Sequence, residues 1–485
     1  MNNLIPLMVI IPLLCALVVN IFSSQNKFVK GLSFIVALII PSIAILANYG
    51  LHFFGGYTPM LDNVTGLIFH PAITYSFDII SKIFIFLVGL LGFLVVFIYI
   101  SNNKKVSGQY LFLIFLGIAA ITAIVLTDDI FNLYVAFEIL VISQVGIIAA
   151  STIEDNYEMA LKYMIIGSIG GPLLLLGISF LIGLFGTVNI TDMVVFIQSG
   201  LVDPTSPPFL MACALIFFGW LYVSGLPPFH TIKSGLYSKA EPHGAAIVQA
   251  FSVIAMISIA LVMCRLFMGI KYFEPLIVAF SVMAMILGIV MALTQNDFRR
   301  MIGFLAVGEL GFIGLGIGLG TTFAITAGIF QAINEMLITA LLFIGFGAVA
   351  RAAGETDLRK LGGLIAYYPK TAILILLGGL AMAGVPPLNG FQSKLMLVQA
   401  SISCGYPELS LLTIIVSIAT FIVFVKTFYM IFLRPKPKDL EVKSKLIPNS
   451  IIFALVVLLI ICVILGLFPN IVTHDISMFV GGLFR

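Results

Sequence analysis

Residues 381–394 read AMAGVPPLNGFQSK, and residues 223–234 read the similar VSGLPPFHTIKS. In each stretch an apolar run is interrupted by Gly-x-Pro-Pro and then continues with polar residues. Proline lacks a backbone donor and clashes with the preceding helical turn, so we expect helix breaks at Pro227 and Pro228 and at Pro386 and Pro387. Inside a bilayer, broken helices are tolerated only against protein or a wet cavity. Two such breaks at matching places in two halves of a chain indicate a transport site.

The composition around these stretches is that of a membrane protein. Of 485 residues, 61% are hydrophobic and 9% are charged, and the mean hydropathy is +1.20. Apolar runs long enough to cross a bilayer recur along the whole chain. We therefore predict an all-α polytopic membrane protein with about fourteen transmembrane helices, of which helices 7 and 12 are broken.

Several classes of function find no support in the sequence. The net charge of +3 is spread thinly and forms no basic face, so we expect no nucleic-acid partner. The five cysteines have neither metal nor redox spacing, and no phosphate loop or nucleophile motif is present. We expect no cofactor, no metal and no catalytic residue in this chain.

Basic residues alternate along the chain and predict its orientation. Links that follow odd-numbered spans carry most of the 24 lysines and arginines, so the positive-inside rule places these links in the cytoplasm and both termini outside. The predicted spans are 4–22, 30–50, 77–100, 110–127, 130–150, 160–185, 209–226, 243–268, 273–294, 300–319, 323–350, 370–398, 409–433 and 450–470.

The two breaks fall in spans seven and twelve, and this offset predicts an inverted repeat. Because the two spans differ by five in number, an odd offset, the units that contain them have opposite orientations in the membrane. We expect four parts: residues 1–109 with helices 1–3, residues 110–268 as the first five-helix repeat, residues 269–433 as the second, and residues 434–485 as a basic loop and helix 14.

Two ionisable residues stand out within the predicted spans, where charge is costly and usually marks an ion path or a pair. Glu138 lies in NLYVAFEILVISQ, with Tyr134 one turn before it on the same face. Lys394 follows the second break and precedes another apolar stretch. For Glu138 the alternative is a pairing for assembly, and for Lys394 it is a lysine that extends to the membrane interface. We favour a role in ion transfer for both.

Two further acids leave structural and functional interpretations open. Glu335 lies between Gln331 and Thr339 at helical spacing, so these side chains form a polar stripe that either joins helices or lines a hydrated path. Glu309 is surrounded by glycines that permit close helix packing, and either a structural pair or a channel role fits it.

Basic residues near span seven complete the candidate set. His230, Lys233 and Lys239 follow the first break, and His230 is the best placed to transfer protons. For the lysines, a wet cytoplasmic loop is the alternative. Lys162 opens span six, where it either faces Glu138 or anchors the helix at the interface.

Four motifs resemble those of one family, the antiporter-like subunits of the respiratory complex I superfamily. They are DDIFNLYVAFEI at 128–139, ALKYMIIGSIG at 160–170, QNDFRRMIGFLAVGELGFI at 295–313 and AGVPPLNGFQSK at 383–394. The superfamily includes NADH–quinone oxidoreductase subunits, the D-type members of Mrp sodium/proton antiporters and membrane subunits of energy-converting hydrogenases. The resemblance implies fourteen helices, inverted five-helix repeats and membership in a larger complex, and it assigns the family's transport glutamate to Glu138 and its span-twelve lysine to Lys394.

The chain departs from the family pattern at its centre. The family usually has a lysine just before the span-seven break, where this chain has Val223 and Ser224. A further basic residue is usual within span eight, where we find Met256 and Ile257. Basic groups usual in span eleven are missing as well. Lys233, Lys239 and water would then carry the middle of the path, or the first half-channel does not conduct. Among relatives, this divergence is closest to the hydrogenase or Mrp D-type members.

The sequence thus predicts a non-catalytic subunit that translocates protons, or exchanges Na⁺ and H⁺, in the cytoplasmic membrane of a prokaryote. Its expected partners are other membrane subunits and a peripheral redox module. Two rivals stay open: a stand-alone cation/proton antiporter, and a structural subunit that has lost conduction.

Overall fold

The computed structural model describes residues 4–47, 51–54, 60–61, 68–69, 73–153, 155–444 and 446–483. Within these ranges, twelve helices are long and apolar enough to cross a membrane, and shorter apolar helices cover Ile5–Ile21 and Pro369–Ala383. The helices are α1 (Leu4–Ile21), α2 (Asn26–Leu46), α3 (Ile79–Asn102), α4 (Gly108–Leu126), α5 (Ile130–Ala149), α6 (Asn156–Phe185), α7 (Ile190–Gln198), α8 (Pro207–Ser224), α9 (His230–Lys239), α10 (Pro242–Phe267), α11 (Phe273–Thr294), α12 (Phe298–Gly318), α13 (Thr322–Ala353), α14 (Pro369–Ala383), α15 (Asn389–Ser403), α16 (Pro407–Phe428), α17 (Asn449–Leu467) and α18 (Asn470–Leu483).

Short elements complete the described fold. Strands β1 (Leu51–Phe54) and β4 (Thr74–Phe77) pair antiparallel, as do β2 (Met60–Leu61) and β3 (Ile68–Phe69). Single turns form η1 (Leu358–Lys360), η2 (Leu364–Ala366) and η3 (Tyr429–Leu433). The all-α membrane architecture is therefore confirmed. Each predicted span corresponds to a long apolar helix, except that span one corresponds to the shorter α1 and span twelve to the pair α14 and α15.

Both predicted breaks are present, and a glycine ends the first half of each broken span. α8 ends before Gly225, whose φ is 73°, and α14 ends before Gly384, whose φ is 78°. Glycine adopts this left-handed conformation without the steric penalty of a side chain. The chain resumes as α9 and α15 after the two proline pairs. The short helices α9 and α15 therefore begin at places set by the Gly-x-Pro-Pro sequence.

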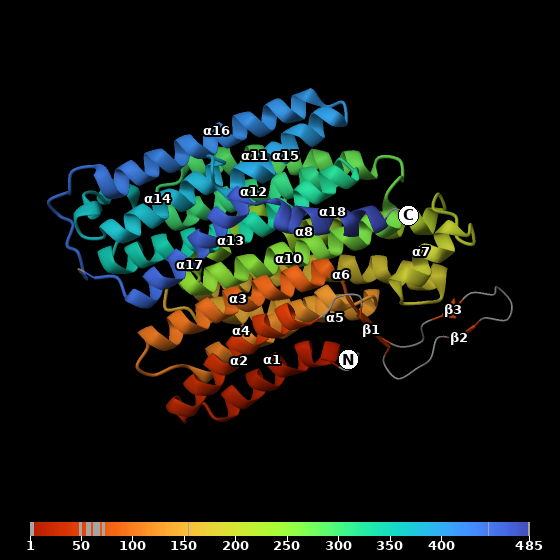
Figure 1. The fold of residues 1–485 in the computed structure, drawn as a ribbon, viewed down its shortest axis with the longest axis horizontal. Helices are drawn as coiled ribbons and strands as arrows, with labels where there is room; N and C mark the ends of the chain where they lie inside the picture. Colours follow the sequence, from red (N-terminus) through yellow and green to blue (C-terminus); the bar gives the residue numbers. More distant parts are fainter. Residues whose placement is uncertain are drawn as a thin grey trace.

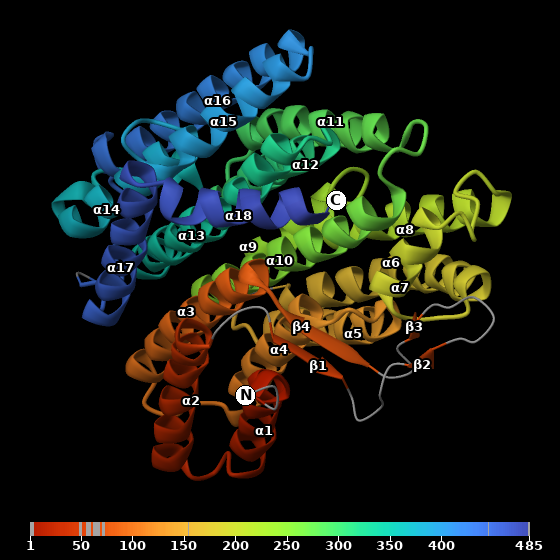
Figure 2. The same cartoon turned by 45° about the vertical axis from the view of Figure 1, so that its right-hand side comes forward.

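The helices form one elongated bundle in which α1 begins and α18 ends at the same end (Figure 1). α5 and α6 lie on one side of α10, and α15 and α16 lie on the other (Figures 1 and 2). α13 packs against α10, α12 and α15 and so links the two sides. Short helix α7, and the C-terminal α18 that packs on α13 and α3, were not predicted.

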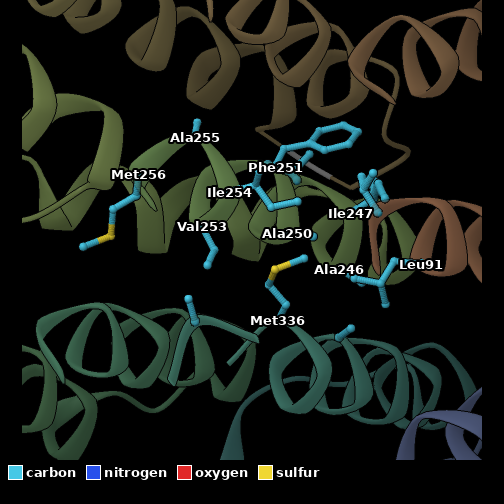
Figure 3. Close-up of a cluster of buried hydrophobic side chains, with 14 of the residues drawn as sticks. Leu91, Ala246, Ile247, Ala250, Phe251, Val253, Ile254, Ala255, Met256 and Met336 are labelled. Atoms are coloured by element: carbon cyan, nitrogen blue, oxygen red, sulfur yellow. The ribbon is translucent and has the colours of Figure 1, made fainter. Parts of the chain in front are cut away.

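The centre of the bundle is apolar around α10. Side chains of α10 such as Ile247, Phe251 and Val253 are fully buried, and Met336 of α13 points toward them (Figure 3). α12 and α13 are also buried along their length, whereas α6 and α16 expose long apolar faces. This apolar surround makes the few polar residues in the same helices conspicuous.

The two halves of the chain share a local feature that accompanies the expected repeat. Asp129 caps α5 and Asp297 caps α12, each accepting hydrogen bonds from backbone N–H groups of the first turn. Each also forms an isolated β-bridge, Asp129 with Asn189 and Asp297 with Asp357. The four domain boundaries stay predictions.

Candidate functional site

Lys394 is held at the second break by a buried ion pair. Its Nζ atom lies 2.8 Å from Oε1 of Glu309 in α12 and donates to the carbonyl oxygen of Met382 at 2.6 Å. The side chains of Lys394 and Glu309 are only 6% and 3% exposed. The break in the helix frees the Met382 carbonyl from its helical partner, and Lys394 satisfies it. The lysine therefore both stabilises the break and neutralises a buried acid.

Polar side chains of α13 continue from this pair. Gln331 donates to the second oxygen of Glu309 at 2.8 Å and accepts from Ser393 at 2.6 Å. One turn further along α13, the amide of Asn389 donates to Asn334 at 2.9 Å. α13 thus holds the broken span through amide hydrogen bonds, and these groups lie away from water.

Lys233 is held at the first break in a related way, but without a carboxylate. The side chain is buried, and Nζ donates to Ser252 at 2.9 Å and to Tyr163 at 3.2 Å. A Cβ placed on Gly225 would clash with Cγ of Lys233, so the lysine folds back over the break. Lys394 similarly lies beside Gly384, with its Cδ 3.2 Å from such a Cβ. In the described part of the chain, no carboxylate lies within ion-pair distance of Lys233.

Glu335 connects these two lysine sites. Gln249 of α10 donates to Oε1 of Glu335 at 3.3 Å, and Gln249 lies one turn before Ser252, the partner of Lys233. Glu335 in turn lies one turn after Gln331, the partner of Glu309. Among the described contacts Glu335 has an amide donor and no cation. We call this set the polar row; its members are Tyr163, Lys233, Ser252, Gln249, Glu335, Gln331, Glu309 and Lys394.

Glu138 lies beyond the first end of the polar row, on the outer part of α5. Its Oε1 occupies the place that a Cβ on Gly171 would take, so it packs directly on the glycine backbone of α6. Tyr222 packs on the neighbouring glycine of α6 and stacks with Tyr163, with ring centroids 6.0 Å apart. Glu138 is half-buried, and Ile142 on the next turn is 62% exposed. Two tyrosine rings therefore separate Glu138 from Lys233.

Three candidate basic residues lie outside the polar row. Lys162 is exposed and pairs with Glu158 on its own helix, so it anchors the helix surface and does not face Glu138. Lys239 forms an exposed pair with Asp155 at 3.2 Å. His230 is half-buried, and its Nδ1 has no hydrogen-bond partner among the described residues. Of the five other candidates, Glu138 lies beyond the end of the polar row, and the fold places Lys233, Glu335, Glu309 and Lys394 within it.

The sequence interpretation identified Gln331 in the polar stripe beside Glu335 but missed the other neutral members of the row. Gln249 and Ser252 lie in span eight, one to two turns before the position where the family usually has a basic residue. Tyr163 is the direct neighbour of the candidate Lys162. Buried amide and hydroxyl groups in an apolar helix need hydrogen-bond partners, and that requirement was the available signal. The row can hold charge at its lysines and acids. Hydrogen bonds join Lys233 to Ser252, Gln249 to Glu335 and Gln331 to Glu309, and one helical turn separates each of these pairs from the next.

Comparison with known proteins gives one family. Residues 127–422 match the family model described as "NADH:quinone oxidoreductase/Mrp antiporter, TM". An uncharacterized protein of Methanocaldococcus jannaschii is 38% identical over 477 residues, which cover 97% of this chain and 96% of that protein. A protein of Alkalihalophilus pseudofirmus that is named as a Na(+)/H(+) antiporter subunit is 26% identical over 482 residues, with coverage of 96% and 94%.

Two solved structures have the same fold over nearly the whole chain. A chain of the Mrp complex from a Dietzia species matches with a TM-score of 0.89 at 20% identity, covering 100% of this chain and 98% of that chain. A chain of the membrane-bound sulfane sulfur reductase, an archaeal respiratory membrane complex, matches with a TM-score of 0.86 at 24% identity and coverage of 99% and 98%. At these identities the likeness concerns the fold.

Proposed function

Because the chain belongs to the NADH:quinone oxidoreductase/Mrp antiporter transmembrane family, we propose that it translocates H⁺, or exchanges Na⁺ and H⁺, across the membrane. It acts as part of a larger complex whose other subunits supply redox chemistry or ion exchange. A relative is named as a Na(+)/H(+) antiporter subunit, and the similar folds come from multisubunit membrane complexes, which supports this assignment. The chain performs no redox step itself.

The observation that carries the proposal is the polar row. It crosses the apolar centre of the bundle from Tyr163 to Lys394 through α9, α10, α13 and α12. Buried charges and amides are costly in such surroundings unless they have a role or a full set of partners. Lys233 and Glu335 have no opposite charge within ion-pair distance among the described residues, so structural pairing alone does not account for them.

Lys233 takes the place of the lysine that the family carries before the first break. Although it follows the break in sequence, its side chain returns over Gly225 and enters the row at Ser252. In this proposal Glu138 exchanges charge at one end of the path, Lys233 and Glu335 carry it through the middle, and the Glu309–Lys394 pair opens at the other end. A change of charge on one group alters the cost of charge on the next, since the medium is poorly screening.

The basic residues of the links support one orientation of the chain in the membrane. We call the end of the bundle that carries the links after odd-numbered spans the basic side, and we propose that it faces the cytoplasm of a prokaryotic cell. Both termini then lie outside.

A test compares Lys233→Met with Lys162→Met in vesicles that hold the intact complex. Methionine keeps the apolar stem of lysine and removes its charge. Loss of coupled ion flux in the Lys233 variant is expected, while the Lys162 variant, changed at an exposed pair, keeps it. Normal flux in an assembled Lys233→Met complex would remove the first half of the path from the account.

The rival structural role rests on one observation, the closed Glu309–Lys394 pair. A buried, fully partnered pair can serve assembly without conduction. Substituting Glu309 and Lys394 singly and then together distinguishes a role in conduction from a role in assembly. When both are replaced, assembly of the complex is expected to recover, whereas ion flux is not.

A further inference from the structure

A polar cavity of about 330 Å³ lies on the basic side, at the seam between the two halves of the chain. It is lined by parts of the links after α5, α9, α13 and η3, by the last turns of α13 and by the first turns of α10 and α12. Its charged lining residues are Glu241, Arg299, Arg351, Glu355 and Lys443. We call this cavity the vestibule. Its size and polar lining suit several water molecules.

An ion pair spans the inner wall of the vestibule. Glu241 accepts from Arg351 at 2.6 Å and also from the hydroxyl of Thr152. Glu241 is 9% exposed, whereas Arg351 is 60% exposed, so the arginine is the partner with room to move. Burial acts to raise the pKa of Glu241, but the Thr152 hydrogen bond and the Arg351 charge outweigh it and hold the pKa below its ordinary value. Glu241 is therefore charged at neutral pH.

A second, much smaller cavity lies next to the vestibule. Its volume is about 20 Å³, room for about one water molecule, and its lining includes Tyr99, Asn102 and His243. Pro242, Gly347 and Arg351 line both cavities. A Cβ on Gly347 would clash with the ring of Pro242, so these two residues form a closed wall. Arg351 is the flexible part of the partition.

His243 is the unexplained group in the small cavity. It is 6% exposed, and its Nε2 is buried without a hydrogen-bond partner in the described chain. The hydroxyl of Tyr110, whose ring centroid lies 5.6 Å from that of His243, is also without a described partner. A buried ring nitrogen that lacks a hydrogen-bond partner, beside a cavity with room for one water molecule, can bind a water molecule or a proton.

Two hydrogen bonds connect the part of α10 near His243 to the polar row. Along α10, little more than one turn past His243, the carbonyl of Val248 accepts from Gln144 at 3.4 Å. Gln144 also accepts from Tyr163 at 2.8 Å, and Tyr163 is the first member of the polar row. Ile147, one turn from Gln144 on α5, stands between Gln144 and the His243 site, where it packs at Gly244.

We propose that His243 is the proton-accepting residue at the entrance of the polar row, and that Arg351 admits water to it by leaving Glu241. A hydronium ion from the vestibule gives its proton to the Nε2 lone pair of His243 and remains as water. The groups that face His243 are Tyr99, Tyr110, Glu241 and Arg351, and departure of the arginine leaves Glu241 to stabilise the charged ring. This inference rests on the proposed function, because it names where a proton enters.

The test is chemical rescue of His243→Ala in vesicles that hold the intact complex with the basic side accessible. We expect coupled flux to fall and to be restored by imidazole added on the basic side. Pyrazole has nearly the same shape but is a much weaker base, and we expect no rescue from it. His474→Ala, changed at an exposed histidine of α18, is the matched control and keeps its flux.

Each other outcome overturns the proposal. Normal flux in His243→Ala, equal rescue by both compounds, or no rescue by imidazole in an assembled complex would each show that His243 does not take up protons here. If the alanine variant fails to assemble, His243→Gln keeps the volume without the basicity, and normal flux in that variant overturns the inference. Lys233→Met distinguishes a failure of this inference from a failure of the proposed function. If Lys233→Met abolishes flux while the His243 variants do not, the proposed function stands and protons enter elsewhere.

Discussion

Breaking the Glu309–Lys394 pair one partner at a time, and then removing both, distinguishes conduction from assembly. The variants are Glu309→Gln, Lys394→Met and the double substitution. Glutamine keeps an oxygen that can accept from Gln331, and methionine keeps the stem that lies beside Gly384. Each single variant leaves one buried group without its opposite charge, whereas the double variant leaves none.

The geometry sets the scale of the effect. At a separation of 2.8 Å and an effective dielectric constant near 20, the gross attraction between the two charges is about 6 kcal/mol. Much of this offsets the cost of taking both charges out of water. Removing one partner of a buried pair typically destabilises a protein by about 3–5 kcal/mol, while replacing both is often nearly neutral. The double variant should therefore be more stable than either single variant.

Two measurements on the purified complex test this prediction. They are the temperature at which this chain unfolds and the coupled ion flux after reconstitution. We expect both single variants to lose stability, the double variant to regain most of it, and all three to lack flux. Single variants as stable as the wild type would refute the buried pair. A double variant that regains flux together with stability would show that the pair serves assembly only.

The remaining predictions concern Glu138 and the Glu241 side chain of the vestibule. Gly171→Ala places a methyl group against the end of the flexible Glu138 side chain, so ion flux should fall with little loss of stability. In the control Gly183→Ala, on the same helix, the added methyl group meets nothing within 4 Å, so neither flux nor stability should change. Equal flux in the two variants would contradict the placement of Glu138. Glu241→Gln should lower thermal stability at neutral pH, because the pKa of Glu241 is held below its ordinary 4.5 in the folded state. The difference in thermal stability between this variant and the wild type should narrow as the pH falls below about 4.5 and Glu241 becomes protonated. A difference in stability that does not depend on pH would contradict the lowered pKa of Glu241.

The positions of the helices followed closely from the sequence, for physical reasons. A bilayer imposes length and apolarity on each span, and Gly-x-Pro-Pro cannot continue a helix, so the spans and both breaks were predicted. α18 was missed because its mixed composition gives no apolar run long enough to span. The short α7 lies in a link, where the same rules do not apply.

The candidate site was predicted in part. Glu309, Glu335 and Lys394 were identified singly because charge is rare in such helices, but which acid pairs with which lysine depends on how α12 and α15 pack, and spacing within one helix does not contain that information. Lys233 illustrates the same limit. Its sequence position left a wet cytoplasmic loop open as the alternative to a place in the path, whereas the fold turns its side chain back across Gly225.

Lys162 shows how a local partner can replace a distant one. Its place at the start of span six was compatible with a partner on α5, but Glu158 lies one turn away on the same helix and takes the charge at the surface. Local pairs of this kind are visible in the sequence as residues four apart, so the Glu158–Lys162 spacing was a signal that this lysine faces outward.

The measurement that tests the central claim most directly is coupled ion flux in vesicles holding the intact complex, with wild type compared to Glu138→Gln and to Lys394→Met. These residues lie at opposite ends of the path, so both substitutions should abolish flux while the complex still assembles. Unchanged flux in both assembled variants would contradict conduction through this chain and would leave it a structural subunit with the fold of a transporter.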